Sequence, residues 1–336
     1  MIQVFMFSVN AVAPILLLLA LGFILSRIGF LPRSFLNKGN TLVFRLLLPM
    51  TIFHNIYTVE DIRGFNWSLI LFSLVVIFLL CALGWLVASF LIQPRESKGV
   101  FIQCTFRSNF AIIGLPLAEA LGGASSAAMA AVLSAFTIPL FNVLAVIVLS
   151  VYSNERKAHS FRKILYDVLT NPLIIAAAVG LFVLFVRSML PFDSSGEPVF
   201  LIARDLPFLW KGIVWLHQTS GPLALLIMGG LLDFNAVKSK ISNIIYGTLF
   251  RIVFAPVIGL FAAYWFNQQG WIDCGAGEFG ALIALFGSPV AVSSAIMAAE
   301  MGGDDELARQ YVVWTAIGSM VSLFMISGFL RWLTII

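Results

Sequence analysis

The sequence predicts an all-α polytopic membrane protein whose ten transmembrane helices form two inverted repeats of five. Composition is the first indication, since 60% of the 336 residues are hydrophobic, 11% are charged, and the mean hydropathy is +1.01. A soluble domain carries about 25% charged residues. One membrane span needs about 20 apolar residues, so the chain accommodates about ten spans and short loops, with no room for a soluble domain.

Apolar runs bounded by polar residues, glycine or proline indicate where the spans lie. The seventh has the weakest signal, because residues 189–206 are polar and 207–220 are only moderately apolar. The first run has no Lys or Arg before Arg27, so it lacks the basic segment of a signal peptide and is expected to remain as a helix. The expected spans are 8–28, 36–57, 67–91, 99–122, 125–150, 165–188, 207–232, 241–266, 277–301 and 307–333.

Lysine and arginine are distributed unevenly between alternate loops. Because basic residues favour cytoplasmic loops, the odd-numbered loops are expected in the cytoplasm and both termini outside it. This clustering explains the net charge of +4 without nucleic acid as a partner. The odd loops carry twelve basic residues: Arg27, Arg33, Lys38, Arg95, Lys98, Arg156, Lys157, Arg162, Lys163, Lys238, Lys240 and Arg309. The opposite side carries five: Arg63, Arg187, Arg204, Lys211 and Arg331.

Two prolines inside apolar segments occur in nearly the same local sequence, Gly114-Leu-Pro116-Leu and Gly287-Ser-Pro289-Val. Each is expected to break its helix within the bilayer. A break frees backbone N–H and C=O groups, which are costly when unsatisfied in hydrocarbon, so breaks persist where the backbone is buried in protein or lines a polar cavity. Matched broken helices in two halves of a membrane protein point to the binding site of a transporter.

The same spacing relates other residues of the two halves. The prolines lie 173 residues apart (289 minus 116), and agreement at one ungapped offset indicates a duplicated unit. A unit of five spans is inverted in its second copy. Spans four and nine are therefore expected to be broken and to cross near the midplane, with half-helix N-termini suited to an anion. The further matches pair Phe35, Leu36, Lys38, Gly39 and Pro49 with Phe208, Leu209, Lys211, Gly212 and Pro222.

The run Asn109-Phe-Ala-Ile-Ile-Gly114-Leu-Pro116-Leu resembles the fourth-helix signature of the auxin efflux carrier family, which includes the plant PIN-FORMED carriers. In that family an Asn precedes the breaking Pro by seven residues and a Gly precedes it by two, as here. The ninth span is similar too, with Pro289 followed by Glu300 and a Gly/Asp-rich turn. The chain lacks the long hydrophilic central loop of the plant carriers. It therefore resembles the short bacterial members, which include malate and malonate permeases.

The resemblance implies a secondary active transporter of small organic anions such as mono- or dicarboxylates. It implies elevator-like alternating access with the site where helices 4 and 9 cross. The expected scaffold, residues 1–66 and 165–235, forms a homodimer, and the expected transport unit comprises residues 67–151 and 236–336. A basic cytoplasmic loop, residues 152–164, joins the halves. A multi-pass protein of the bacterial inner membrane is expected, coupled to a proton or to sodium, without a cofactor.

Five positions near the two prolines are candidate substrate-binding residues: Asn109, Gly114, Pro116, Ser288 and Pro289. The alternative for the prolines is a simple kink, which transmembrane helices tolerate. The amide of Asn109 can donate to a carboxylate and accept from a hydroxyl group. Its alternative is an interhelical hydrogen bond, worth roughly 0.6 kcal/mol in membranes.

Arg107 and Arg251 fall within expected spans, where charged residues are functional candidates. An arginine can hold a carboxylate through two parallel hydrogen bonds. Arg107 could instead extend to the membrane interface. Arg251 could instead pair with a carbonyl or an acid inside the transport unit.

Four further polar residues have weaker assignments. Glu119 and Glu300 follow the two prolines, and a buried carboxyl group could carry a coupling proton, although a structural role at a helix end is favoured. His54 and His217 have no second ligand three or four residues away, so a metal site is not expected.

Other functional classes fit less well. A sodium-coupled organic-anion symporter of the bile-acid-transporter type remains an alternative. So does a cation/proton antiporter, but such antiporters use intramembrane Asp pairs, and no pair of Asp residues falls within the expected spans, with Asp233 just beyond the end of the seventh. The chain has no HExxH, GxSxG, CxxC or P-loop motif, so an enzyme is not expected.

Overall fold

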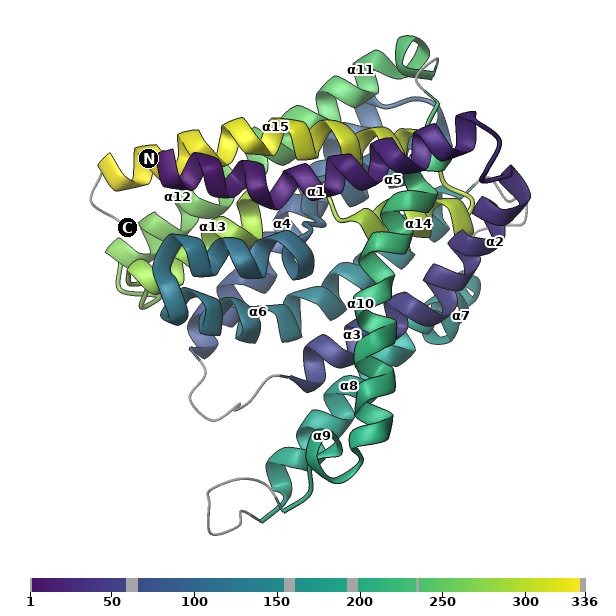
Figure 1. Ribbon diagram of the computed structural model, residues 1–336. Helices are drawn as coiled ribbons and strands as arrows, with labels where there is room; N and C mark the ends of the chain where they lie inside the picture. Colours follow the sequence, from purple (N-terminus) through teal and green to yellow (C-terminus); the bar gives the residue numbers. More distant parts are fainter. Residues whose placement is uncertain (1, 59–65, 154–160, 192–198, 234–235, 333–336) are drawn as a thin grey trace.

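The computed structural model describes residues 2–58, 66–153, 161–191, 199–233 and 236–332. Within these ranges the regular structure is helical, and the first and last helices run side by side in opposite directions (Figure 1). The π-helical turns are η1 (Val43–Leu47), η2 (Phe110–Gly114) and η3 (Phe250–Phe254). The α-helices are α1 (Ile2–Arg27), α2 (Arg33–Leu42), α3 (Leu48–Tyr57), α4 (Trp67–Leu91), α5 (Arg95–Phe106), α6 (Leu115–Tyr152), α7 (Phe161–Thr170), α8 (Pro172–Met189), α9 (Ile202–Asp205), α10 (Pro207–Gly230), α11 (Ala236–Leu249), α12 (Ala255–Gln268), α13 (Ala276–Gly287), α14 (Val292–Glu300) and α15 (Asp305–Trp332).

Several helical segments of the described chain are long and apolar enough to cross a membrane. The protein is therefore an all-helical, multi-pass membrane protein, whereas the ten-span count and the inverted repeat remain predictions. Residues 154–160 of the expected basic loop, Arg63, and residue 333 of the expected last span lie outside the described residues. The five long segments are Trp67–Leu91, Phe110–Tyr152, Pro172–Met189, Val237–Gln268 and Asp305–Leu330, and shorter apolar helices cover Ala13–Arg27 and Ala276–Gly287.

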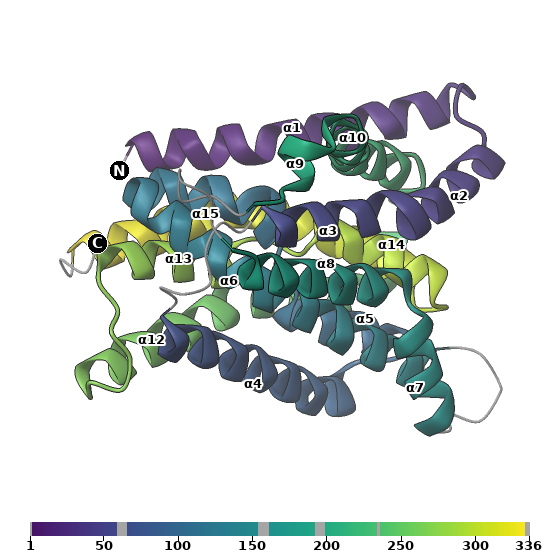
Figure 2. The ribbon, with the colours of Figure 1, turned by 90° about the horizontal axis from the view of Figure 1, so that it is seen from below.

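Glycines allow α1 and α10 to pack very closely. A Cβ atom on Gly22 would lie 2.1 Å from the carbonyl oxygen of Leu226, and one on Gly229 would lie 2.1 Å from that of Leu19. Small residues that let backbones approach are a common means of helix association in membranes. Figure 2 shows α1, α10 and α3 toward one side of the molecule and α4 and α12 toward the other. The division into scaffold and transport unit remains a prediction.

The segment α2–η1–α3 packs antiparallel to α10. At one end of this pair, a Cβ atom on Gly39 would lie 2.8 Å from Cδ1 of Ile227. At the other end, the rings of Tyr57 and Trp210 lie 4.9 Å apart between centroids. Residues near the two N-terminal ends of these elements therefore lie at opposite ends of the pair.

Each π-helical turn ends two residues before a proline, namely Pro49, Pro116 and Pro256. A proline cannot donate a hydrogen bond to the carbonyl four residues earlier, and its ring crowds that carbonyl. In all three places the residue before the proline donates to the carbonyl five residues earlier, so one extra residue is accommodated in the turn. The helix continues through the proline with a local distortion. The predicted break at Pro116 is therefore wrong.

The first true break covers Arg107, Ser108 and Asn109, between α5 and η2. The second covers residues 288–291, between α13 and α14, and contains Pro289 as predicted. The two extended segments lie antiparallel: the Asn109 N–H donates to the Pro289 carbonyl at 2.7 Å, and the Ala291 N–H donates to the Arg107 carbonyl at 3.3 Å.

The paired positions have a sequence separation that differs from the predicted offset of 173 between the halves. Ser108 bridges to Val290, which is 182 positions later (290 minus 108). The offset of 173 stays a prediction, but Pro116 lies inside a helix and Pro289 lies in a break, so their backbone environments differ. After the first break the chain runs through α6 to Gly122 and Gly123, where non-helical backbone, with φ of 66° at Gly123, separates the two parts of that helix.

Candidate functional site

Arg251 supplies hydrogen bonds to the carbonyls that the two breaks leave without helical partners. Its side chain is fully buried, at 0% exposure, and Nε donates to the Ser288 carbonyl at 2.9 Å. Its terminal nitrogens donate to the carbonyls of Thr105, Leu285 and Phe286 at 3.1–3.3 Å. A positive charge at helix C-termini also complements the negative ends of α5 and α13. This contact satisfies backbone groups that would otherwise be costly in the membrane.

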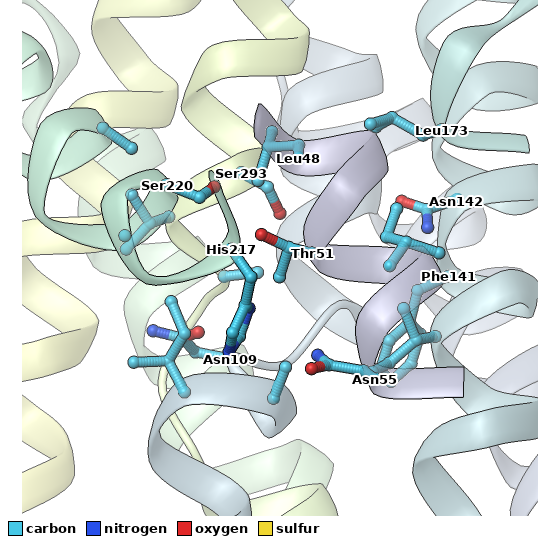
Figure 3. A pocket seen from close by; sticks show the side chains of 18 of the residues that line it. Leu48, Thr51, Asn55, Asn109, Phe141, Asn142, Leu173, His217, Ser220 and Ser293 are labelled. Atoms are coloured by element: carbon cyan, nitrogen blue, oxygen red, sulfur yellow. The ribbon is translucent and has the colours of Figure 1, made fainter. Parts of the chain in front are cut away.

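A cavity of ≈ 330 Å³ is lined in part by residues of the paired breaks, and Arg251 is not among its lining residues. Its size lies within the range of small-molecule sites in proteins. In Figure 3, Thr51 and Asn55 point from α3 across the cavity toward His217 and Asn109. The lining residues come from α3, α6, α8, α10, α14, η2 and both breaks: Leu48, Thr51, Ile52, Asn55, Arg107, Ser108, Asn109, Ala111, Ile112, Ile138, Phe141, Asn142, Leu173, His217, Gln218, Ser220, Gly221, Pro222, Ala224, Ala291, Val292 and Ser293.

Arg107 provides the cationic group of the cavity wall, where the described lining residues include no Asp or Glu. The side chain is 4% exposed, and Nη2 donates to Asn142 Oδ1 at 2.7 Å and to Ser293 Oγ at 2.9 Å. Nη1 donates to the thioether sulfur of Met297. No described carboxylate forms an ion pair with it. Neutral partners orient the guanidinium group but leave its charge uncompensated.

Several polar atoms around the cavity are buried and have no hydrogen-bond partner among the described residues. Buried polar groups are normally satisfied, so each such atom requires an explanation. A polar ligand in the cavity would provide partners for this set. The atoms are Ser108 Oγ, Asn142 Nδ2, His217 Nδ1 and Ser220 Oγ.

The helices that restart after the breaks present their N-terminal turns to the cavity. Ala111 and Ile112 of η2 line it, as do Val292 and Ser293 of α14. The first N–H groups of a helix have no intrahelical acceptor and carry partial positive charge. Two such ends beside Arg107 make this side of the cavity suitable for a negatively charged group.

The predicted site residues separate into two groups. Arg107 and Asn109 line the cavity, whereas Gly114, Pro116, Ser288, Pro289 and Arg251 are not among its lining residues. Ser288 Oγ donates to the Ala284 carbonyl at 2.6 Å, in the last turn of the preceding helix α13. A Cβ atom on Gly114 would lie 2.3 Å from the Phe110 ring, so this glycine allows local packing. Ser288 and Pro289 form part of the second break and Arg251 bonds to its carbonyls, whereas Gly114 and Pro116 lie in the helix that follows the first break.

Sequence reasoning missed several polar residues that line the cavity. Thr51 and Asn55 are four residues apart on one face of α3, which is a signal available in the sequence. The local sequence gives no signal for Asn142 or Ser293, because their contacts with Arg107 depend on the fold. His217 contacts His54, with ring centroids 4.1 Å apart. The described residues contain no cluster of metal-binding side chains.

Glu119 and Glu300 occupy different environments. Glu119 is exposed on α6 and does not line the cavity. Glu300, at the end of α14, accepts hydrogen bonds from Asn40 Nδ2 at 2.9 Å and Thr41 Oγ1 at 2.8 Å. Glu300 therefore connects α14 to α2, two elements assigned to different units of the expected architecture.

A family profile described as "Membrane transport protein" matches residues 7–327 of the chain. An uncharacterized transporter of Methanocaldococcus jannaschii is 24% identical over 274 residues, which cover 79% of this chain and 82% of the relative. An uncharacterized transporter of Methanothermobacter thermautotrophicus is 21% identical over 329 residues, which cover 96% of this chain and 98% of the relative. Neither name specifies a substrate.

Proposed function

Because the chain belongs to the auxin efflux carrier family of membrane transport proteins, we propose that it is a secondary active transporter of small organic anions. The proposed substrates are mono- or dicarboxylates, and the proposed binding site is the cavity beside the paired helix breaks. The protein would lie in a bacterial inner membrane as a homodimer formed through the scaffold, with both termini outside the cytoplasm.

Arg107 carries this proposal. A buried charge without a counter-ion is costly, and an anionic ligand would remove that cost. A carboxylate could accept two hydrogen bonds from the guanidinium group, while Asn109 and the orphaned Nδ2 of Asn142 offer further donors. The apolar part of the substrate would pack against the hydrophobic wall, which includes Ile112 and Phe141.

The composition of the wall supports alternating access. One part comes from α3, α8 and α10, which belong to the expected scaffold, and the other from α6, α14 and the breaks, which belong to the expected transport unit. A rigid displacement of one unit against the other would carry the breaks and their bound anion across the membrane, as in an elevator. The alternatives are a sodium-coupled anion symporter and a cation/proton antiporter, but a described wall without carboxylates favours an anion over a cation.

Counterflow in proteoliposomes tests this function. Vesicles preloaded with unlabelled acid would receive labelled malate, malonate or acetate, each with and without a sodium or pH gradient. We expect at least one acid to accumulate transiently in vesicles containing the protein and not in protein-free vesicles. If no organic anion moves under any gradient, the proposed function is wrong.

A further inference from the structure

Two histidines from different helices meet face to face at the cavity. The rings of His54 on α3 and His217 on α10 have centroids 4.1 Å apart and planes inclined by 9°. Trp210, two turns before His217, also stacks on His54, with centroids 5.1 Å apart. His217 lines the cavity, and its buried Nδ1 has no hydrogen-bond partner among the described residues. The pair therefore has a nitrogen available beside the proposed substrate.

Charge repulsion limits how many protons this pair can hold. Two unit charges this close repel strongly inside a protein, where the effective dielectric constant is well below that of water. Histidine is also the side chain whose charge ordinarily changes between about pH 5 and pH 8. The two rings should thus titrate as one coupled unit, with a neutral state and a singly protonated state.

We propose that His54 and His217 form a proton-binding pair that takes up one proton from solvent when a carboxylate occupies the cavity. This inference rests on the proposed function. The proton binds an imidazole nitrogen, the carboxylate stays ionised, and no covalent bond to the substrate changes. Without an anion, the protonated pair and Arg107 would place two positive charges at one cavity. An anion between these two positive charges attracts both of them and offsets their repulsion. Anion binding and proton binding therefore strengthen each other to the same degree.

The other described charged side chains on the elements around the pair do not line the cavity, so we assign the proton to the pair and the contact with the anion to Arg107. Arg187 on α8 donates to the Tyr57 carbonyl at 2.7 Å, and Lys211 lies over the Trp215 ring, 5.2 Å from its centroid. On α9, Arg204 pairs with Asp205 at 3.1 Å, and Glu300 on α14 accepts from Asn40 and Thr41 as described above. Arg45 of η1 and Glu119 of α6 are exposed. None of these groups is among the described cavity lining.

Nuclear magnetic resonance of histidine-labelled protein in nanodiscs tests the pair without any substrate. The chain has three histidines, so His159→Gln leaves only the two of interest. We expect their resonances to titrate in two coupled steps, and we expect His54→Gln to convert the titration of His217 into a single step. Independent one-step titration of both histidines in the His159→Gln protein would overturn the proposal.

Calorimetric titration with malate, malonate and acetate, in buffers of different ionisation enthalpy, tests the link to the anion. Wild-type protein should take up as much as one proton per anion, and its apparent Kd should rise toward tenfold per pH unit once the free pair has lost its proton. His217→Gln should bind with little proton uptake and a flat pH dependence, whereas the matched control His159→Gln should behave as wild type. Equal proton uptake by the wild type and His217→Gln would overturn this inference alone. Absence of binding by all three acids would contradict the proposed function and this inference with it.

Discussion

Arg107 and Arg251 are both buried beside the helix breaks, but their partners give them different roles. Arg251 donates to four backbone carbonyls, so its hydrogen-bonding capacity is used in holding helix ends together. Arg107 is held by an amide, a hydroxyl and a thioether at the cavity wall. At the residue scale, the identity of the acceptors thus distinguishes a structural arginine from a candidate binding arginine.

Replacing Arg251 should impair stability before it impairs binding. Arg251→Gln cannot reach all four carbonyls, and each buried group left unsatisfied costs about 1–3 kcal/mol. We expect the unfolding temperature in detergent to fall by about 5–10 °C. Arg45→Gln, at an exposed position, is the matched control and should change it little. An unchanged unfolding temperature for Arg251→Gln would contradict the assignment.

At the scale of the secondary-structure element, local backbone conformation determines where the helices around the site continue and where they break. The π-helical turns allow three prolines to remain inside helices, whereas short polar or proline-containing segments produce the two breaks. Gly122 and Gly123 then interrupt α6, and Gly123 has φ of 66°, a conformation that residues with a Cβ atom adopt at a cost.

Two glycine replacements separate conformational strain from packing. No heavy atom lies within 4 Å of a Cβ atom built on Gly123 or on Gly212, and only Gly123 has a positive φ. Gly123→Ala should therefore destabilise the protein by about 1–3 kcal/mol. Gly212→Ala, inside α10, should be neutral or stabilise by up to about 1 kcal/mol. Thermal unfolding of both variants checks this, and equal effects would contradict the role of Gly123.

The contact of Glu300 with α2 should restrain α14. Glu300→Ala removes both hydrogen bonds to Asn40 and Thr41. We therefore expect α14 to separate from α2 more often, which opens the cavity on the side of the protein where these two helices meet. A maleimide reagent applied from that side should label Ala111→Cys several-fold faster in this background. The native cysteines Cys81, Cys104 and Cys274 are buried, which limits background labelling. Glu119→Ala is the exposed control, and an equal increase there would refute a specific restraint.

At the scale of the whole molecule, the antiparallel pairing of α2–η1–α3 with α10 agrees with a change of orientation between the halves. Lys38 and Lys211 are both exposed and lie toward opposite ends of this pair. In sealed vesicles, a membrane-impermeant maleimide should label Lys38→Cys from the cytoplasmic side and Lys211→Cys from the other. Labelling of both positions from the same side would contradict the inverted repeat and the proposed topology.

The sequence was sufficient to predict the membrane class, the transporter family and two candidate residues, Arg107 and Asn109, that line the cavity. It misplaced the first break because proline marks a local helix distortion, and a π-helical turn can accommodate it without a break. The better signal was the polar run Arg107-Ser108-Asn109 itself. The role of Arg251 depends on carbonyls 34 to 146 residues away, and the stacking of His54 on His217 depends on helix packing. Neither feature follows from local sequence.

Equilibrium binding in nanodiscs tests the central claim most directly. The acid that gives the strongest counterflow would be titrated into wild-type protein, Arg107→Gln and Arg107→Lys. Because Arg107→Gln removes the charge and leaves a carboxylate uncompensated, we expect its affinity to fall about 100-fold or more, with Arg107→Lys intermediate because it cannot form two parallel hydrogen bonds. Wild-type affinity in Arg107→Gln, with its unfolding temperature unchanged, would contradict the assignment of the cavity as the anion site.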